Sequence, residues 1–199
     1  MKNEERPQHQ ATARSRTVAT TVLMVATFMD LMDSTITNVA LPTIGKDLHA
    51  TPEQLEWTLA GYVIAFATLL ITGGRLGDIF GHRRIFVIGM VGFTLASLGA
   101  ALSQTGDLLV ATRVIQGAFA GIMVPQVLSS VQVMFAPEER APVLGIIGAL
   151  SSLGAIGGLI LGGWLVTTDL LGMGWRSIFL VNVPVGVVLV AAALLFVPR

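Results

Sequence analysis

Towards its C-terminal end the sequence reads Val185-Gly-Val-Val-Leu-Val-Ala-Ala-Ala-Leu-Leu-Phe-Val197, a run without a single polar side chain. A second run, Ile64–Thr72, contains no charged residue. The strands of a membrane β-barrel alternate polar and apolar residues over about ten positions. Because both runs lack this alternation, they exclude a β-barrel and favour helices that are buried in lipid.

The composition of the whole chain also favours a bilayer as its environment. Of the 199 residues, 53% are hydrophobic and only 12% are charged, whereas soluble domains carry about 25% charged residues. The formal net charge is zero, so nothing indicates a nucleic-acid partner. The chain has no cysteine, which excludes disulfides.

The predicted fold class is an all-α membrane protein with six transmembrane helices. A helix needs about 20 mostly apolar residues to cross roughly 30 Å of hydrocarbon. The segments that meet this requirement are 17–41, 57–74, 85–105, 108–135, 141–168 and 177–197. We expect the polar residues 1–16 to form a disordered tail, and 17–199 to form one six-helix bundle.

Basic residues predict the orientation of these helices. With the N-terminus inside, nine basic residues fall on the inner side and only Lys46 and Arg176 on the outer side. The inner residues are Lys2, Arg6, Arg14, Arg16, Arg75, Arg83, Arg84, Arg140 and Arg199. Since basic residues concentrate on the cytoplasmic side, we predict a multi-pass protein of the cell (inner) membrane with both termini cytoplasmic.

The turn between the second and third segments reads Gly74-Arg-Leu-Gly-Asp78-Ile-Phe-Gly81-His-Arg83-Arg84. Glycines permit a tight turn, the arginines anchor the inner face, and Asp78 can lie near the start of the third helix, where a negative charge is favourable. A merely basic inner loop would need neither the aspartate nor this glycine spacing.

The first segment carries two carboxylates, Asp30 and Asp33. Together with Thr37 they share one helix face, because residues three and four apart are neighbours on a helix. A carboxylate at hydrocarbon depth is costly, so it normally faces a cavity or a partner. A structural polar patch that packs against another helix is the alternative.

Arg113 of the fourth segment lies at a similar depth to Asp33. At 1.5 Å per residue, Asp33 is about 12 Å and Arg113 about 8–9 Å below the outer helix ends. We therefore expect the two charges to pair, unless Arg113 extends to the outer interface instead.

The fifth and sixth segments contain features of helix packing. Gly154, Gly158 and Gly162 form a stripe at which another helix can approach closely, and Gly145 and Gly163 belong to the same glycine-rich segment. Plain packing is sufficient to explain these glycines. In the sixth segment, we expect Asn182 to make a helix–helix hydrogen bond.

Taken together, these motifs resemble the major facilitator superfamily, and in particular its fourteen-span drug:proton antiporters. The loop signature matches at Gly74, Leu76, Gly77, Asp78, Gly81 and Arg83, while Ile79 and His82 replace usual basic residues. The other elements that match are Asp33–Pro42, the Arg-x-x-Gln-Gly run that starts at Arg113, the glycines of the exporters' signature, and Trp175–Pro184. Leu159 stands where the exporters' signature has proline.

The resemblance implies half of a major facilitator fold, built as a 3+3 inverted repeat, that exports drug-like molecules by proton-coupled alternating access. The proton-coupling and cavity residues would be Asp33, Arg113, Asp30, Asn38 and Gln116, with Asp33 as the exchanging carboxylate; Asp30 has no counterpart in the family pattern. The gating loop would be formed by Gly74, Asp78, Gly81, Arg83 and Arg84, and the exporters' helix-packing glycines would be Gly145, Gly154, Gly158, Gly162 and Gly163.

A complete transporter of this superfamily has two six-helix halves, so a C-terminal half is the expected partner, besides the lipid bilayer and a small-molecule substrate. It would be downstream sequence, a separate subunit or a second copy; alternatively, the chain has only an assembly role. An enzyme is not expected, because no segment offers a nucleophile–base pair. We expect no metal and no cofactor beyond the proton, since His9, His49 and His82 all lie outside the segments.

Overall fold

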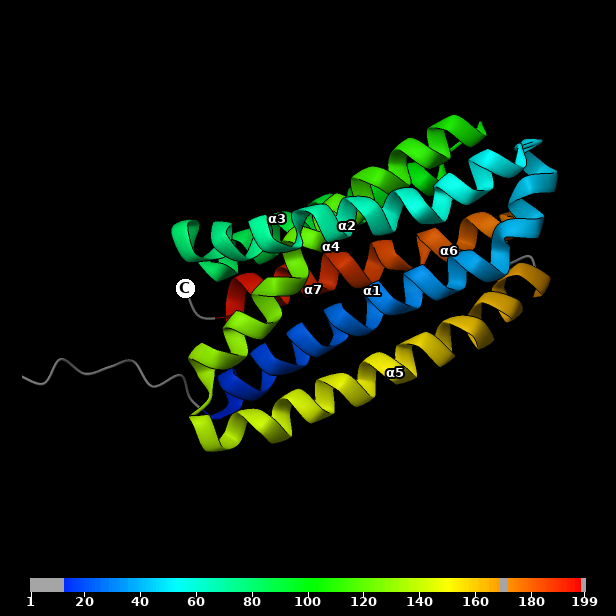
Figure 1. The fold of residues 1–199 in the computed structure, drawn as a ribbon. Coiled ribbons are helices and arrows are strands. Elements are labelled where there is room, and N and C mark those ends of the chain that lie inside the picture. Colours follow the sequence, from blue (N-terminus) through cyan, green and yellow to red (C-terminus); the bar gives the residue numbers. More distant parts are fainter. Residues whose placement is uncertain (1–12, 169–171, 198–199) are drawn as a thin grey trace, which may run out of the picture.

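The computed structural model describes residues 13–168 and 172–197, which contain six apolar helical spans and no strand (Figure 1). The elements are α1 (Ala13–Leu48), α2 (Pro52–Phe80), α3 (His82–Ala101), α4 (Gly106–Met134), α5 (Pro137–Thr168), η2 (Gly174–Arg176), α6 (Ser177–Leu180) and α7 (Asn182–Phe196). The short η2 and α6 join α7 to make the last span, 174–196. The predicted six-helix fold is confirmed.

The helices extend beyond the apolar segments that predicted them. Helix α1 begins at Ala13, inside the expected tail, and continues through Pro42 to Leu48. The outer loop that we expected over residues 42–56 is therefore reduced to 49–51. A helix satisfies its own backbone hydrogen bonds, so it can continue into the polar interface after its apolar stretch has ended. Residues 1–12 of the expected tail lie outside the described residues.

The start of α2 follows from local side-chain chemistry. Gln54 N–H donates to Thr51 Oγ1 (3.2 Å), and Thr51 N–H donates to Gln54 Oε1 (2.9 Å). This reciprocal pair satisfies two backbone donors that a helix start leaves free, and Pro52 occupies the first helical turn. At the other end, Gly81 alone joins α2 to α3 with φ of +93°, a conformation that favours glycine.

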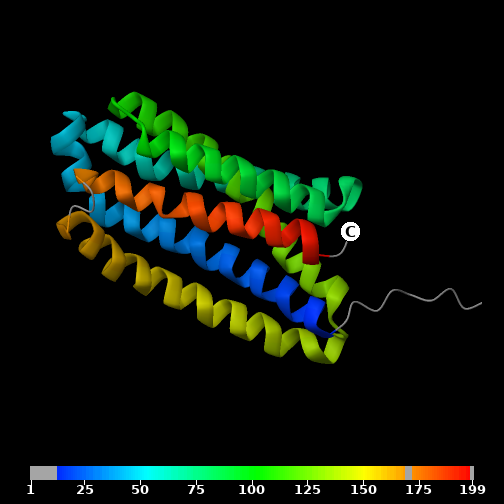
Figure 2. The same ribbon diagram turned by 180° about the vertical axis from the view of Figure 1, so that it is seen from behind.

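The packing of the spans has the predicted 3+3 pattern. Helix α2 runs along α4, α1 runs along α5, and α3 packs against the last span (Figures 1 and 2). If the first three spans are exchanged with the last three, the α2–α4 pair becomes the α5–α1 pair, as an inverted repeat requires. The beginning of α1 and the end of α7 lie at the same end of the bundle.

Three glycines of α5 allow its close approach to α1. A Cβ atom would lie 2.9 Å from the Phe28 carbonyl oxygen at Gly154, and 2.8 Å from the Met32 carbonyl oxygen at Gly158. At Gly162 it would lie 2.8 Å from a side-chain carbon of α1. The predicted packing stripe is therefore formed by these three residues.

Within the described residues, Gly145 and Gly163 do not pack in this way, so their role as packing glycines stays a prediction. A Cβ atom at either position would meet no atom within 4 Å. The reason is helical geometry, because each residue turns the helix by about 100°. Gly163 is thus turned away from its neighbour Gly162, and Gly145 lies about half a turn away from Gly154.

Candidate functional site

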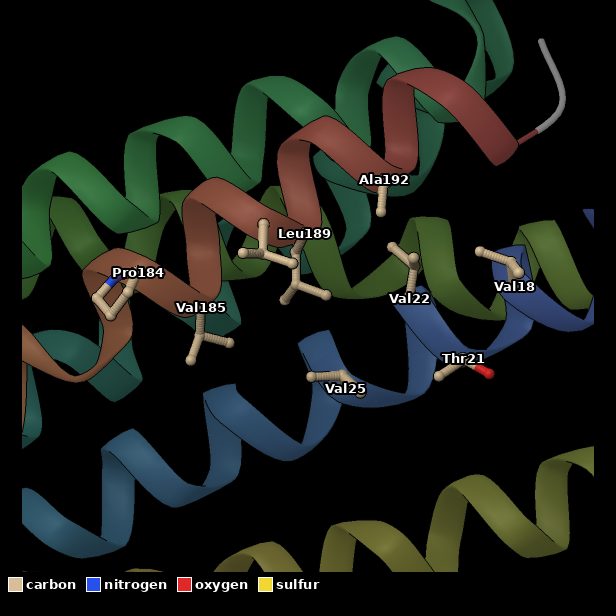
Figure 3. Close-up of a pocket in the computed structure, with 9 residues that line it drawn as sticks. Val18, Thr21, Val22, Val25, Pro184, Val185, Leu189 and Ala192 are labelled. Carbon is tan, nitrogen blue, oxygen red and sulfur yellow. The ribbon is translucent and has the colours of Figure 1, made fainter.

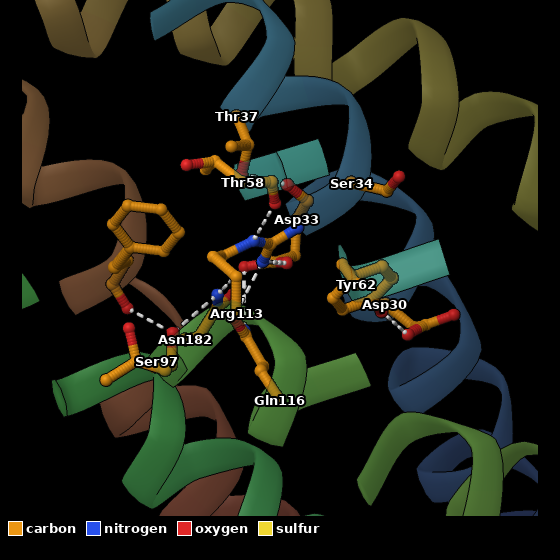
Figure 4. Close-up of polar contacts among 12 residues, drawn as sticks. Asp30, Asp33, Ser34, Thr37, Thr58, Tyr62, Ser97, Arg113, Gln116 and Asn182 are labelled. Atoms are coloured by element: carbon orange, nitrogen blue, oxygen red, sulfur yellow. Dashed lines mark hydrogen bonds and ion pairs between the residues drawn. The ribbon is translucent and has the colours of Figure 1, made fainter. Parts of the chain in front are cut away.

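An ion pair between α1 and α4 lies at the centre of the bundle (Figure 4). Arg113 Nη1 donates to Asp33 Oδ2 at 2.5 Å. The side chains are only 1% and 0% exposed, respectively. The pairing that the depth estimate predicted is confirmed, and Arg113 does not extend to the interface.

Amide side chains complete the hydrogen bonding of this pair. Gln116 contacts both partners, because its Nε2 donates to Asp33 Oδ1 (3.0 Å) and its Oε1 accepts from Arg113 Nη1 (2.6 Å). Asn182 Nδ2 of α7 donates to the same Asp33 oxygen at 2.6 Å. A buried ion pair is tolerated only when additional hydrogen bonds satisfy its remaining polar atoms, and these amides provide them.

Asn182 also connects the pair to α3. Its Nδ2 lies 3.0 Å from Ser97 Oγ, and the Ser97 hydroxyl donates to the Phe179 carbonyl oxygen at 2.9 Å. The expected helix–helix hydrogen bond of Asn182 is therefore present. Among the buried side-chain atoms of the described residues, Asn182 Oδ1 is the one without a hydrogen-bond partner.

Tyr62 of α2 covers the Arg113 guanidinium and links it to Asp30. The guanidinium carbon lies 4.2 Å from the ring centre, within the range of an attractive cation–π contact. The Tyr62 hydroxyl donates to Asp30 Oδ1 at 2.5 Å. Asp30 thereby joins the cluster through the tyrosine, while Asn38 is exposed and donates to the Ser34 carbonyl of its own helix instead.

At the α2–α3 turn, the residues of the gating loop have different surroundings. Asp78 lies in the last turn of α2, with its carboxylate 3.7 Å from Nε2 of His82, the first residue of α3. His82 Nδ1 is 2.9 Å from Gln126 Oε1, and Gln126 Nε2 donates to the Gly73 carbonyl at 2.7 Å. The histidine and the glutamine therefore connect the turn to α4.

Arg83 connects the same turn to the last span. Its Nη1 lies 3.4 Å from the Leu194 carbonyl oxygen and 3.3 Å from that of Val197, at the end of α7. Arg84 is exposed, and Gly74 lies near Pro125 of α4, with ordinary van der Waals space for a Cβ atom. The loop residues do not contact the Asp33–Arg113 pair.

An apolar groove of about 500 Å³ lies between α1 and α7 (Figure 3), and neither Asp33 nor Arg113 lines it. Its lining includes Val18, Val22, Val25, Pro184, Val185 and Leu189. No charged side chain lines this groove, and the polar side chain in its lining is that of Thr21.

Sequence reasoning missed Tyr62, Ser97 and Thr58 as members of the cluster. The Thr58 carbonyl accepts from Arg113 Nε at 3.4 Å. Tyr62 is the one tyrosine in the chain and lies inside an apolar segment, where a phenol requires a hydrogen-bond partner. The sequence therefore contained a signal that could have identified Tyr62. Ser97 gave none, since serine is common at helix contacts in membranes.

Comparison with known proteins identifies the family. The model of the Major Facilitator Superfamily matches residues 23–199. The chain is 44% identical, over 92% of its length, to a probable actinorhodin transporter of Streptomyces coelicolor. It is 40% identical, over 89% of its length, to the tetracenomycin C resistance and export protein of Streptomyces glaucescens. These matches cover 32% and 31% of the relatives, so the chain spans about a third of their length.

The fold is also shared with a solved structure. A bacterial homologue of the human lysosomal transporter Spinster, in an inward-facing and occupied conformation, matches 94% of this chain with a TM-score of 0.81 and 18% identity. The match covers 46% of that chain. Six apolar spans, the 3+3 packing and the family match lead to one conclusion: this chain is a multi-pass membrane protein that belongs to the Major Facilitator Superfamily.

Proposed function

We propose that this chain is the N-terminal half of a proton-coupled exporter of drug-like small molecules. The observation that carries the proposal is the Asp33–Arg113 pair, closed to solvent between two spans. Ionisable residues inside a membrane bundle are expensive, and they mark ion or substrate pathways. A pair that served packing alone would be replaceable by apolar residues at no cost in stability.

Export, rather than import, is supported by the relatives. One relative is named a tetracenomycin C resistance and export protein. Another, from Amycolatopsis lactamdurans, is named a cephamycin export protein. It is 39% identical to this chain over 94% of the chain's length. Leu159, at the position where the exporters' signature has proline, is 52% exposed on α5. The side chain at this position therefore lies outside the α1–α5 contact.

A second six-helix half is part of this proposal. Only 17% of the apolar stretch of α2, and the same share of α5, is buried within the bundle, against 61% for α3. Gly145 and Gly163 lie on the open side of α5, and glycine suits a close helix contact better than a lipid contact. We infer that α2 and α5 receive the C-terminal half, whether it is downstream sequence, a separate subunit or a second copy.

The test compares efflux of ethidium from drug-sensitive cells that produce the chain alone or together with a C-terminal half. We expect efflux only from the combination, and we expect Arg113→Ala in this chain to abolish it. Efflux by the chain alone would identify a second copy as the partner. If the combination exports normally with Arg113→Ala, the chain has an assembly role only, and if no combination exports, the proposal of export is wrong.

A further inference from the structure

The charges inside the bundle are not balanced. Within the apolar segments predicted from the sequence, the spans contain two acidic residues, Asp30 and Asp33, and one basic residue, Arg113. Asp33 accepts hydrogen bonds at both oxygens, one of them from the arginine. In the part of the chain that the structure describes, Asp30 has no ion pair, and its hydrogen-bond donor is the neutral Tyr62 hydroxyl.

Among the described residues, the one cation that faces Asp30 is Arg113, which already forms an ion pair with Asp33. The groups that face it are Asp33 on its own helix, Tyr62 on α2 and Arg113 on α4. Helix α7 contains no ionisable residue, and α3 and α5 contain none after Arg84 and Arg140, respectively. An ionised Asp30 would therefore give the bundle interior an uncompensated negative charge, which is costly at this depth. A protonated Asp30, or an ionised Asp30 beside a bound cation, avoids that cost.

We propose that Asp30 carries the exchangeable proton of this transporter, and that Tyr62 is the positioning residue that connects it to Arg113. The inference rests on the proposed function and assigns to Asp30 the proton exchange that the family resemblance implied for Asp33. Asp33 is then the fixed counter-ion of Arg113. Asp30 as a residue is 7% exposed, whereas Asp33 is fully buried, so Asp30 is the one of the two that reaches the surface of the bundle.

The exchange step is a simple proton transfer. The O–H bond of the Asp30 carboxyl group breaks, and the proton passes to a water molecule. Asp30 is left as a carboxylate, which is stabilised by the hydrogen bond that the Tyr62 hydroxyl donates to it. The new negative charge lies next to the tyrosine whose ring contacts Arg113. A cationic substrate near Asp30 would compensate that charge, so a lipophilic cation and the proton would compete for the same group.

The direct test is infrared difference spectroscopy of the purified chain in lipid as the pH is raised. We expect the C=O band of a protonated carboxylic acid to disappear with pH in the wild type and to be absent from Asp30→Asn. Tyr62→Phe keeps the ring over Arg113 and removes the hydroxyl, so it should shift the band. Glu56→Gln, which removes an exposed carboxylate outside the cluster, is the control and should keep the band. A band that persists in Asp30→Asn, or a wild type without any such band, would overturn the assignment.

A second measurement separates this inference from the proposed function. Addition of tetraphenylphosphonium to the purified assembly with both halves should release protons from the wild type and from Glu56→Gln. We expect no release from Asp30→Asn. If the infrared band belongs to Asp30 but the wild type releases no proton, Asp30 is still the protonated group, and the proposal of proton-coupled export is wrong. Undiminished release from Asp30→Asn would refute the inference itself.

Discussion

Arg113 contacts Asp33 and Tyr62 with different parts of one guanidinium group: Nη1 donates to the carboxylate at 2.5 Å, and the central carbon lies 4.2 Å from the centre of the phenol ring. The charge is thus compensated by an anion from α1 and covered by an aromatic face from α2. Helix α4 brings the arginine between them. Three spans are held together by one cation, so its loss should affect stability as well as transport.

The first prediction concerns the cost of breaking the ion pair. Arg113→Ala should destabilise the chain by about 3–5 kcal/mol, because it leaves a buried carboxylate without its counter-ion. Arg113→Ala combined with Asp33→Asn should cost clearly less than the sum of the two single changes. Unfolding in mixed detergent micelles, followed by circular dichroism, measures all four proteins of the cycle. Additive effects would mean that the two side chains are not coupled.

The second prediction uses two glycines on opposite sides of α5. Gly158→Leu should prevent the docking of α5 on α1, since even a Cβ atom would lie 2.8 Å from the Met32 carbonyl oxygen. Gly163→Leu is the matched control, because its Cβ atom would meet nothing within 4 Å. We expect Gly158→Leu to lower the melting temperature of the chain strongly and Gly163→Leu to leave it nearly unchanged. Equal effects would show that α5 packs through another face.

The third prediction concerns the single-residue link between α2 and α3. Gly81 has φ of +93°, a region that is strained for residues with a side chain. Gly81→Ala should therefore cost about 1–3 kcal/mol, although no neighbouring atom lies within 4 Å of the added carbon. Gly74→Ala, at a position inside α2 with ordinary van der Waals space for a Cβ atom, is the control. Equal stability of the two variants in thermal unfolding would exclude backbone strain as the reason for Gly81.

Hydropathy was sufficient to predict the six spans, since length and apolar content are the properties that a bilayer selects. The depth of Asp33 and Arg113 also followed from the sequence, because the rise of a helix converts residue number into distance. The boundaries were less predictable. Pro42 marked the end of an apolar stretch, but α1 continues to Leu48, since helical hydrogen bonding does not require apolar side chains.

The membership of the cluster was only partly predictable, because it depends on how the spans rotate about their axes. Gln116 was expected in the cluster from the resemblance, because it belongs to the Arg-x-x-Gln-Gly run that starts at Arg113. Tyr62 and Ser97 come from other helices, whose facing sides a single sequence does not specify. Asn38 was expected in the cluster, yet it lies on the exposed side of α1. The predicted turn is shorter than expected, because Gly81 alone links α2 to α3, and the other gating-loop residues lie within these two helices. The Arg83 contact to the end of α7 required the tertiary structure.

The fourth prediction concerns orientation. Reporter insertions at His49 and Gln104 should report the outside of the cell, and insertions at Gly81 and Ala136 the inside, because the basic residues concentrate at the latter end. All four positions lie in short links between helices, where insertions disturb packing least. Reversed signals at both pairs would invert the topology and place the gating loop outside.

The central claim is that protons drive export through this cluster. Its most direct test is the uptake of tetraphenylphosphonium into inverted membrane vesicles that contain both halves, after the vesicle lumen has been made acidic. The account predicts accumulation in the wild type and in Glu56→Gln that a protonophore abolishes, and no accumulation in Asp30→Asn or Arg113→Ala. Wild-type accumulation that persists without the pH gradient, or gradient-driven accumulation that survives in both of these variants, would contradict the account.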